Sequence, residues 1–218
     1  MAKKQKGGSL SWLQPAVLAG TLAPLAMLIW LAARRELGAN PVAEALNQLG
    51  LVALTLLTAT LACTPLKVLV GWAWPMRLRK TLGLMGFAYA ALHAAVYSGL
   101  DQVLDIRAIW DDVVKRKFIF VGFAALLCLV PLAVTSTAGA IRRMGSKNWK
   151  RLHRLAYLAA SLGVLHFIWR VKVDLTEPLI YGAILSGLFL VRIGKSLQDR
   201  AKRRAAAVAA SAVASSPA

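Results

Sequence analysis

The chain alternates between long apolar runs and short polar or basic tracts over most of its length. Each run approaches the ~20 residues that an α-helix needs to cross a bilayer. Six such runs are present, at residues 14–33, 45–66, 82–100, 118–140, 155–171 and 179–193. The pattern therefore predicts an all-α integral membrane bundle of six transmembrane helices.

The tracts between the runs are too short to build a soluble unit. We therefore expect one six-helix domain over residues 13–194, preceded by a short segment at residues 1–12. The tail at residues 195–218 is basic and then rich in alanine and serine, and it is expected to extend the last helix before fraying. The tract at residues 101–117 reads DQVLDIRAIWDDVVKRK, which is too polar to cross and indicates an amphipathic surface helix.

Composition supports a membrane protein and excludes a soluble one. Hydrophobic residues make up 58% of the chain, charged residues make up 17%, and the mean hydropathy is +0.60. The net charge of +18 would suggest nucleic acid in a soluble protein, but here the basic residues flank apolar runs, so nucleic acid is rejected. Cys63 and Cys128 both lie inside apolar runs and are interpreted as small buried hydrophobic residues.

The excess positive charge lies in alternate tracts along the chain. The N-terminal segment, the second and fourth loops and the tail are basic, whereas acidic residues balance the basic ones in the first, third and fifth loops. By the positive-inside rule, both termini and the basic loops are predicted to be cytoplasmic. One local exception is the basic triplet at residues 115–117 on the predicted outer side.

Histidine is the candidate chemistry of this chain, which contains only three. His93 lies thirteen residues after Lys80, and His166 lies twelve residues after Arg154, on helices predicted to run in the same direction. At ~1.5 Å of rise per residue the two imidazoles should stand at nearly the same depth. Two imidazoles at one level could ligate one haem iron from opposite faces, an arrangement suited to electron transfer. A zinc site is less favoured, because no third ligand stands at that level.

His153 is predicted to belong to a different site. It lies thirteen residues before His166, which places it roughly 20 Å lower along the helix axis, at the cytoplasmic edge. It could ligate a haem with an unusual partner, contact an anionic cofactor or a haem propionate, or simply hydrogen-bond a neighbouring helix.

The basic residues on the predicted cytoplasmic side have an ordinary explanation as topology signals and contacts to lipid headgroups. A convergent subset of them could also hold the phosphate of a flavin mononucleotide, because guanidinium groups bind phosphate bidentately. The candidates are Arg77, Arg79 and Lys80 before the third run and Arg142, Arg143, Lys147, Lys150 and Arg151 before the fifth.

Three segments resemble the MsrQ family, formerly called YedZ, within the ferric-reductase-like transmembrane superfamily. They are RLRKTLGLMGFAYAALHAAVY, KRKFIFVGFAALLCLVPLAVTS and NWKRLHRLAYLAASLGVLHFIWRVK followed by EPLIYGAILSGLFL. The similarity covers roughly residues 51–192, and the segment with paired histidines is its most specific part. Members are haem-binding membrane subunits of a bacterial methionine sulfoxide reductase system.

The resemblance implies six helices, b-type haem and flavin mononucleotide. The histidines of the family match His93, His153 and His166 as haem ligands, and its basic pair before the third helix matches Arg79 and Lys80. Lys80 stands where relatives have a second arginine, and lysine cannot reproduce the arginine fork at a flavin phosphate. Lys117-Phe118 also departs from the Pro-Tyr of many relatives.

The implied function is electron delivery across the bacterial inner membrane. The donor would be quinol or a cytosolic flavin reductase, and the acceptor would be MsrP, a periplasmic molybdopterin enzyme that repairs oxidised methionines. No residue is assigned as a nucleophile or general acid, because the cofactor carries the chemistry. Two alternatives remain at this point: a ferric or superoxide-type reductase with a soluble acceptor, and a non-redox transporter or assembly factor.

Overall fold

The structure, a computed structural model, describes residues 12–214, with side chains described as far as residue 207. All regular elements in this part of the chain are helical, in agreement with the predicted all-α fold. The helices are α1 (Leu13–Ala33), α2 (Pro41–Leu69), α3 (Pro75–Val96), α4 (Ile106–Lys115), α5 (Lys117–Val134), α6 (Ala138–Leu152), α7 (Leu155–Arg170) and α8 (Thr176–Ala214), and a π-helical turn η1 (Tyr97–Asp101) follows α3. The predicted segment at residues 1–12 lies almost wholly outside the described residues.

Four helices are long and apolar enough to cross a membrane, namely α1, α2, α5 and α8. The pair α6 and α7 meets the same test as one span bent by 40°, which gives up to five crossings in the described chain. The first two turns of α3 carry Arg77, Arg79 and Lys80, and α3 does not meet the test. Six crossings with cytoplasmic termini therefore remain a prediction, which requires α3 to cross as well.

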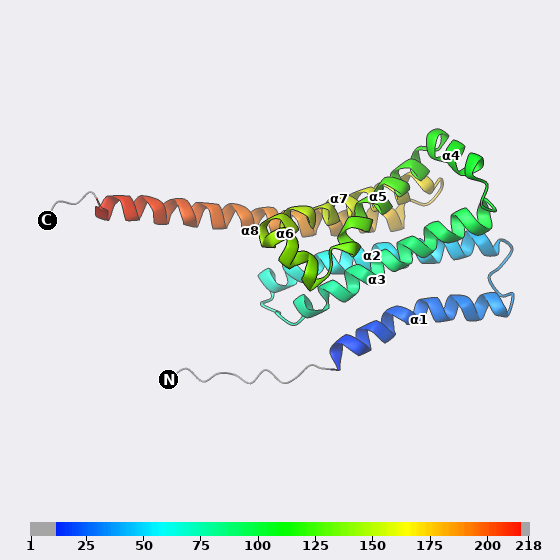
Figure 1. The fold of residues 1–218 in the computed structure, drawn as a ribbon, viewed down its shortest axis with the longest axis horizontal. Coiled ribbons are helices and arrows are strands. Elements are labelled where there is room, and N and C mark those ends of the chain that lie inside the picture. The colour runs from blue at the N-terminus through cyan, green and yellow to red at the C-terminus, as the bar shows by residue number, and fades with distance from the viewer. Residues whose placement is uncertain (1–11, 215–218) are drawn as a thin grey trace.

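The helices lie side by side in an elongated bundle (Figure 1). Helix α4 lies across one end, which we call the α4 end, and α8 continues alone beyond the opposite end, which we call the α8 end. Three clusters of buried side chains hold the bundle together: Leu49, Leu56 and Tyr89 between α2 and α3, Leu129 and Ala159 between α5 and α7, and Leu61, Ala160 and Leu185 among α2, α7 and α8. Ala159 and Ala160 are almost fully buried, because small side chains let membrane helices approach closely.

Helix α1 packs on α3 through a buried tyrosine. The Tyr89 hydroxyl donates to the carbonyl oxygen of Thr21 at 2.6 Å and accepts from the Leu25 amide at 3.1 Å. These two backbone groups lie four residues apart and would otherwise bond to each other, so the hydroxyl is inserted into the ladder of α1 beside Pro24. Figure 1 shows that α1 bends along its length.

The structure shows an amphipathic helix in the tract at residues 101–117 and changes two boundaries. Helix α4 is amphipathic, with Ile106 and Trp110 strongly exposed. The fourth apolar run was expected to reach residue 140, but α5 ends at Val134, because the hydroxyls of Thr135 and Ser136 bond to carbonyls of its last turn. The following basic tract was interpreted as a loop and is instead α6, which is capped by the Thr137 side chain at its first turn and broken by a kink at Gly145. Helix α8 does continue into the tail, as expected.

Candidate functional site

His93 on α3 and His166 on α7 lie together in the structure. Their ring centroids are 6.1 Å apart, and the ring planes are nearly perpendicular, at 87°. Both side chains line one cavity of about 380 Å³ between α2, α3, α5 and α7 near the α4 end. The helices that the sequence predicts to be parallel thus bring the two imidazoles to one level.

Each imidazole is fixed by a backbone carbonyl of the neighbouring helix. His93 Nδ1 lies 2.9 Å from the Leu46 oxygen on α2, and His166 Nδ1 lies 2.7 Å from the Phe118 oxygen on α5. A carbonyl oxygen can only accept, so each Nδ1 must carry the proton. The lone pair of each ring is therefore on Nε2, the nitrogen that a metal ligand presents when Nδ1–H is held in this way.

Two glycines make these contacts possible. A Cβ added at Gly50 would lie 3.2 Å from His93 Nδ1, and one added at Gly122 would lie only 2.6 Å from His166 Nδ1. Gly50 follows Leu46 by four residues, and Gly122 follows Phe118 by the same four. Each histidine ring therefore lies against one turn of the neighbouring helix. The carbonyl at the start of that turn accepts its hydrogen bond, and the glycine four residues later leaves room for the ring.

The cavity walls are mainly apolar. They are formed by residues such as Leu51, Leu54, Leu57, Ala90, Leu126 and Leu129. The volume falls within the range of small-molecule and cofactor pockets, which is roughly 300–1,000 Å³. Apart from the two histidines, the polar side chains in the lining include Asn47, Tyr97, Arg116 and Arg170 near the α4 end.

The donor set fits haem iron and does not fit a metal held by protein ligands alone. No group of three or more His, Cys, Asp or Glu residues suited to a metal ion occurs in the described chain. A porphyrin supplies four nitrogens and needs only axial ligands, which two imidazoles provide. With metal–imidazole bonds of about 2 Å and about 1 Å from nitrogen to ring centroid, two imidazoles on one iron have centroids roughly 6 Å apart. The 6.1 Å separation agrees with that requirement.

His153 lies elsewhere, at the end of α6, and does not line this cavity. Its ring stacks on Trp149 with centroids 3.8 Å apart, and Nδ1 is 3.2 Å from the Trp149 carbonyl oxygen. Its Nε2 atom is buried and has no hydrogen-bond partner among the described residues. The sequence places His153 apart from the other two histidines, and the structure keeps it apart.

The basic residues proposed for a flavin phosphate occupy different surroundings. Arg77 and Lys80 are exposed on α3, whereas Arg79 is partly buried. Arg79 lies within electrostatic range of His153 and of Arg192 on α8. Arg192 was not selected from the sequence, although it is the only arginine within the sixth apolar run. It donates hydrogen bonds to the Tyr157 hydroxyl and to the Leu61 carbonyl.

Comparison with known proteins defines the class of this fold and site. The family of ferric reductase like transmembrane components matches residues 49–164, a range that contains His93 and His153. The chain is therefore a ferric-reductase-like membrane protein.

Curated relatives narrow this class. The chain is 51% identical over 84% of its length to the protein-methionine-sulfoxide reductase heme-binding subunit MsrQ of Rhodospirillum rubrum, covering 90% of that protein. The MsrQ of Deinococcus radiodurans is 49% identical over 84% of this chain and 90% of its own length. That of Herminiimonas arsenicoxydans is 42% identical over 91% of this chain and 92% of its own length. The chain belongs to the MsrQ family.

Proposed function

We propose that this protein is a b-type haem-binding subunit that carries electrons through the membrane to a methionine sulfoxide reductase. One observation carries the proposal: two imidazoles on neighbouring helices share one cavity, with Nδ1 held by carbonyls and centroids 6.1 Å apart. Haem, when bound there, supplies one-electron transfer. The relatives of this chain are named as heme-binding subunits of protein-methionine-sulfoxide reductase, which supports the same conclusion.

The protein residues would bind and orient the haem and surround it with apolar side chains. His93 and His166 would hold the haem iron, and with both imidazoles bound the iron would keep no position for oxygen or substrate. The carbonyls of Leu46 and Phe118 select the tautomer and fix the ring planes of the ligands. The leucine-rich walls give the space around the two rings a mainly apolar lining.

The direction of transfer follows from the predicted topology. If the basic tracts are cytoplasmic, the α4 end faces the periplasm, where MsrP, the molybdopterin reductase, would receive electrons. Quinol or a cytosolic flavin reductase would act as donor at the α8 end. Flavin mononucleotide would bind there as well, with its phosphate near Arg79 and with Arg77 and Lys80 as further candidates. The neighbouring Arg192 would add to the positive surroundings.

Absorbance of the purified protein tests the proposal. Protein from haem-sufficient cells should show a reducible low-spin b-type spectrum, and colourless protein would contradict the proposed function. Either His93→Ala or His166→Ala should abolish the low-spin spectrum, because each removes one axial ligand. His153 lies outside the cavity, so His153→Ala should perturb that spectrum less or affect a different cofactor. Equal loss in all three variants would refute the assignment of the two ligands.

A further inference from the structure

Arg170 stands at the polar mouth of the cavity, one helical turn beyond His166 on α7. Its side chain is partly buried and lines the same cavity as the two histidines. One Nη atom donates to the side-chain oxygen of Asn47, the residue after the carbonyl that holds His93. A guanidinium has five N–H donors, so most of the hydrogen-bonding capacity of Arg170 is not used by that single amide.

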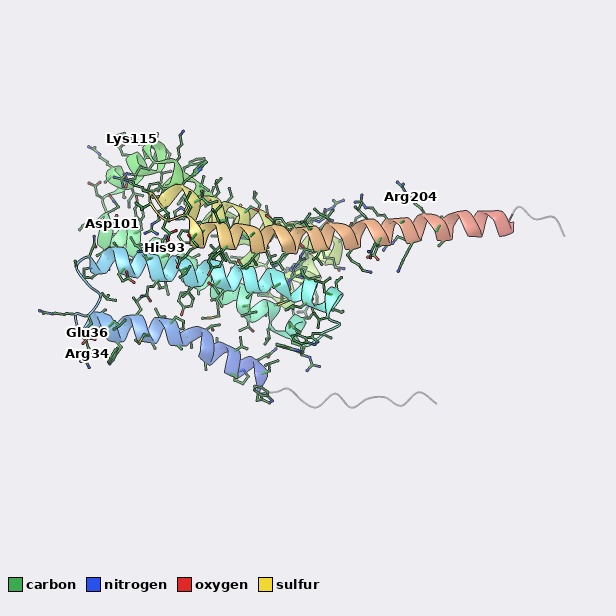
Figure 2. The ribbon with its side chains drawn as sticks, turned by 180° about the vertical axis from the view of Figure 1, so that it is seen from behind. Arg34, Glu36, His93, Asp101, Lys115 and Arg204 are labelled. Atoms are coloured by element: carbon green, nitrogen blue, oxygen red, sulfur yellow. The ribbon has the colours of Figure 1, made fainter. Side chains whose placement is uncertain are left out.

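The acidic residues at the mouth are engaged with other groups. The Asp112 carboxylate accepts from the Tyr97 hydroxyl at 2.9 Å and from Gln102 at 3.3 Å, and it pairs with Arg116 at 3.0 Å. Asp101, which also lines the mouth, accepts from Gln102 at 3.0 Å. In the described chain, therefore, neither carboxylate forms an ion pair with Arg170. Figure 2 shows Asp101 and His93 at the same end of the bundle.

A cavity of this polarity suits an amphipathic ligand with an anionic edge. The inner walls are apolar, the two imidazoles lie within them, and a cation without an acidic partner stands at one end. A partly buried cation is costly unless an anion joins it. Haem has an apolar macrocycle and two propionate groups on one edge, so its shape and charge match this arrangement.

We propose that Arg170, held by Asn47, binds a haem propionate, so that the propionate edge faces the α4 end. The inference rests on the proposed function, because it requires haem between His93 and His166. The planar fork of arginine matches a carboxylate bidentately, and such charge-assisted bonds are stronger than neutral ones. The contact from Asn47 limits the side-chain freedom that Arg170 would otherwise lose on binding.

The test compares haem with its dimethyl ester, in which both propionates are esterified. Full-length apoprotein in detergent is reconstituted with either compound, and loss of the porphyrin to excess apomyoglobin is timed. The wild type should lose the ester about tenfold faster than haem, the size expected for one charge-assisted bond at a partly exposed site. In Arg170→Gln the two rates should become nearly equal, because the group that distinguishes a carboxylate from an ester is gone.

The matched control is Lys172→Gln, which removes the same charge from an exposed position two residues further along the chain. It should keep the tenfold ratio of the wild type. Arg170→Met, which retains the apolar stem, replaces Arg170→Gln if that variant does not fold. A ratio that stays tenfold in the neutral Arg170 variant would overturn the inference. Failure of the wild type to bind either porphyrin would instead refute the proposed function.

Discussion

The substitution Gly122→Ala places a methyl group against the ring of His166. The new Cβ would lie 2.6 Å from Nδ1, 2.9 Å from Cε1 and 3.3 Å from Cγ of that ring. Ordinary contact begins at about 3.4 Å, so the ring or the helix must move by about 0.8 Å. A shift of that size would stretch the 2.7 Å bond from Nδ1 to the Phe118 oxygen to the limit of a hydrogen bond.

The expected consequence is weaker haem binding rather than a weaker helix. Alanine is favoured over glycine by about 1 kcal/mol in a helix interior, so the substitution should not destabilise α5 by its own propensity. Loss of the partner that orients a metal-ligating histidine typically lowers affinity by roughly 10–100-fold. Gly122→Ala should therefore reduce haem retention at least tenfold, and the low-spin spectrum should lose intensity.

The same substitution at two other glycines provides a graded series. At Gly50 the new Cβ would lie 3.2 Å from His93 Nδ1, so the ring must yield by only a few tenths of an ångström and the loss should be smaller. At Gly187 on α8 nothing lies within 4 Å, and haem binding should be unchanged. Haem content per polypeptide and thermal unfolding in detergent would measure both effects. A folded Gly122→Ala protein with the wild-type haem content and spectrum would refute the reasoning.

Three further predictions concern the framework. Tyr89→Phe removes the hydroxyl that joins α1 to α3 and should lower the free energy of unfolding, measured by thermal unfolding, by about 1–2 kcal/mol. Tyr181→Phe loses only an exposed contact to Thr55 and should lower it less. Equal losses would contradict the role of Tyr89. Arg192→Leu should loosen the docking of α8 on α2 and α7, seen as faster proteolysis within α8; unchanged proteolysis would count against it. A reporter enzyme that is active only in the periplasm should be active when it is fused after Lys115. A reporter that is active only in the cytoplasm should be inactive there, and the opposite result would reverse the predicted orientation.

Much of the site could be predicted from spacing along the chain. Counting residues from the basic tracts puts His93 and His166 at one depth, and the structure places their rings 6.1 Å apart. Depth alone cannot show which side chain or carbonyl a ring faces. The roles of Gly50 and Gly122 depend on how α2 meets α3 and how α5 meets α7, and in the sequence they are indistinguishable from other glycines in apolar runs.

The features that sequence reasoning missed have a common cause. Helix α6 lies in a tract read as a loop because it is basic, yet the tract is helical on both sides of a break at Gly145, where φ is 74°. Arg170 and Arg192 stand near the ends of the fifth and sixth apolar runs, and neither was assigned a role. In each case hydropathy records that a residue is charged but does not show which groups its side chain contacts in the folded protein. Three-dimensional packing is needed to show that Arg170 faces the histidine cavity.

In the proposed function, the neutral imidazoles of His93 and His166 ligate one iron. Low-temperature electron paramagnetic resonance of the oxidised full-length protein, combined with near-infrared magnetic circular dichroism, identifies both axial ligands directly. The arrangement predicts a low-spin ferric haem with bis-histidine ligation and nearly perpendicular ligand planes, as the 87° angle between the rings requires. A high-spin five-coordinate haem, or a low-spin haem with a ligand other than histidine, would contradict it.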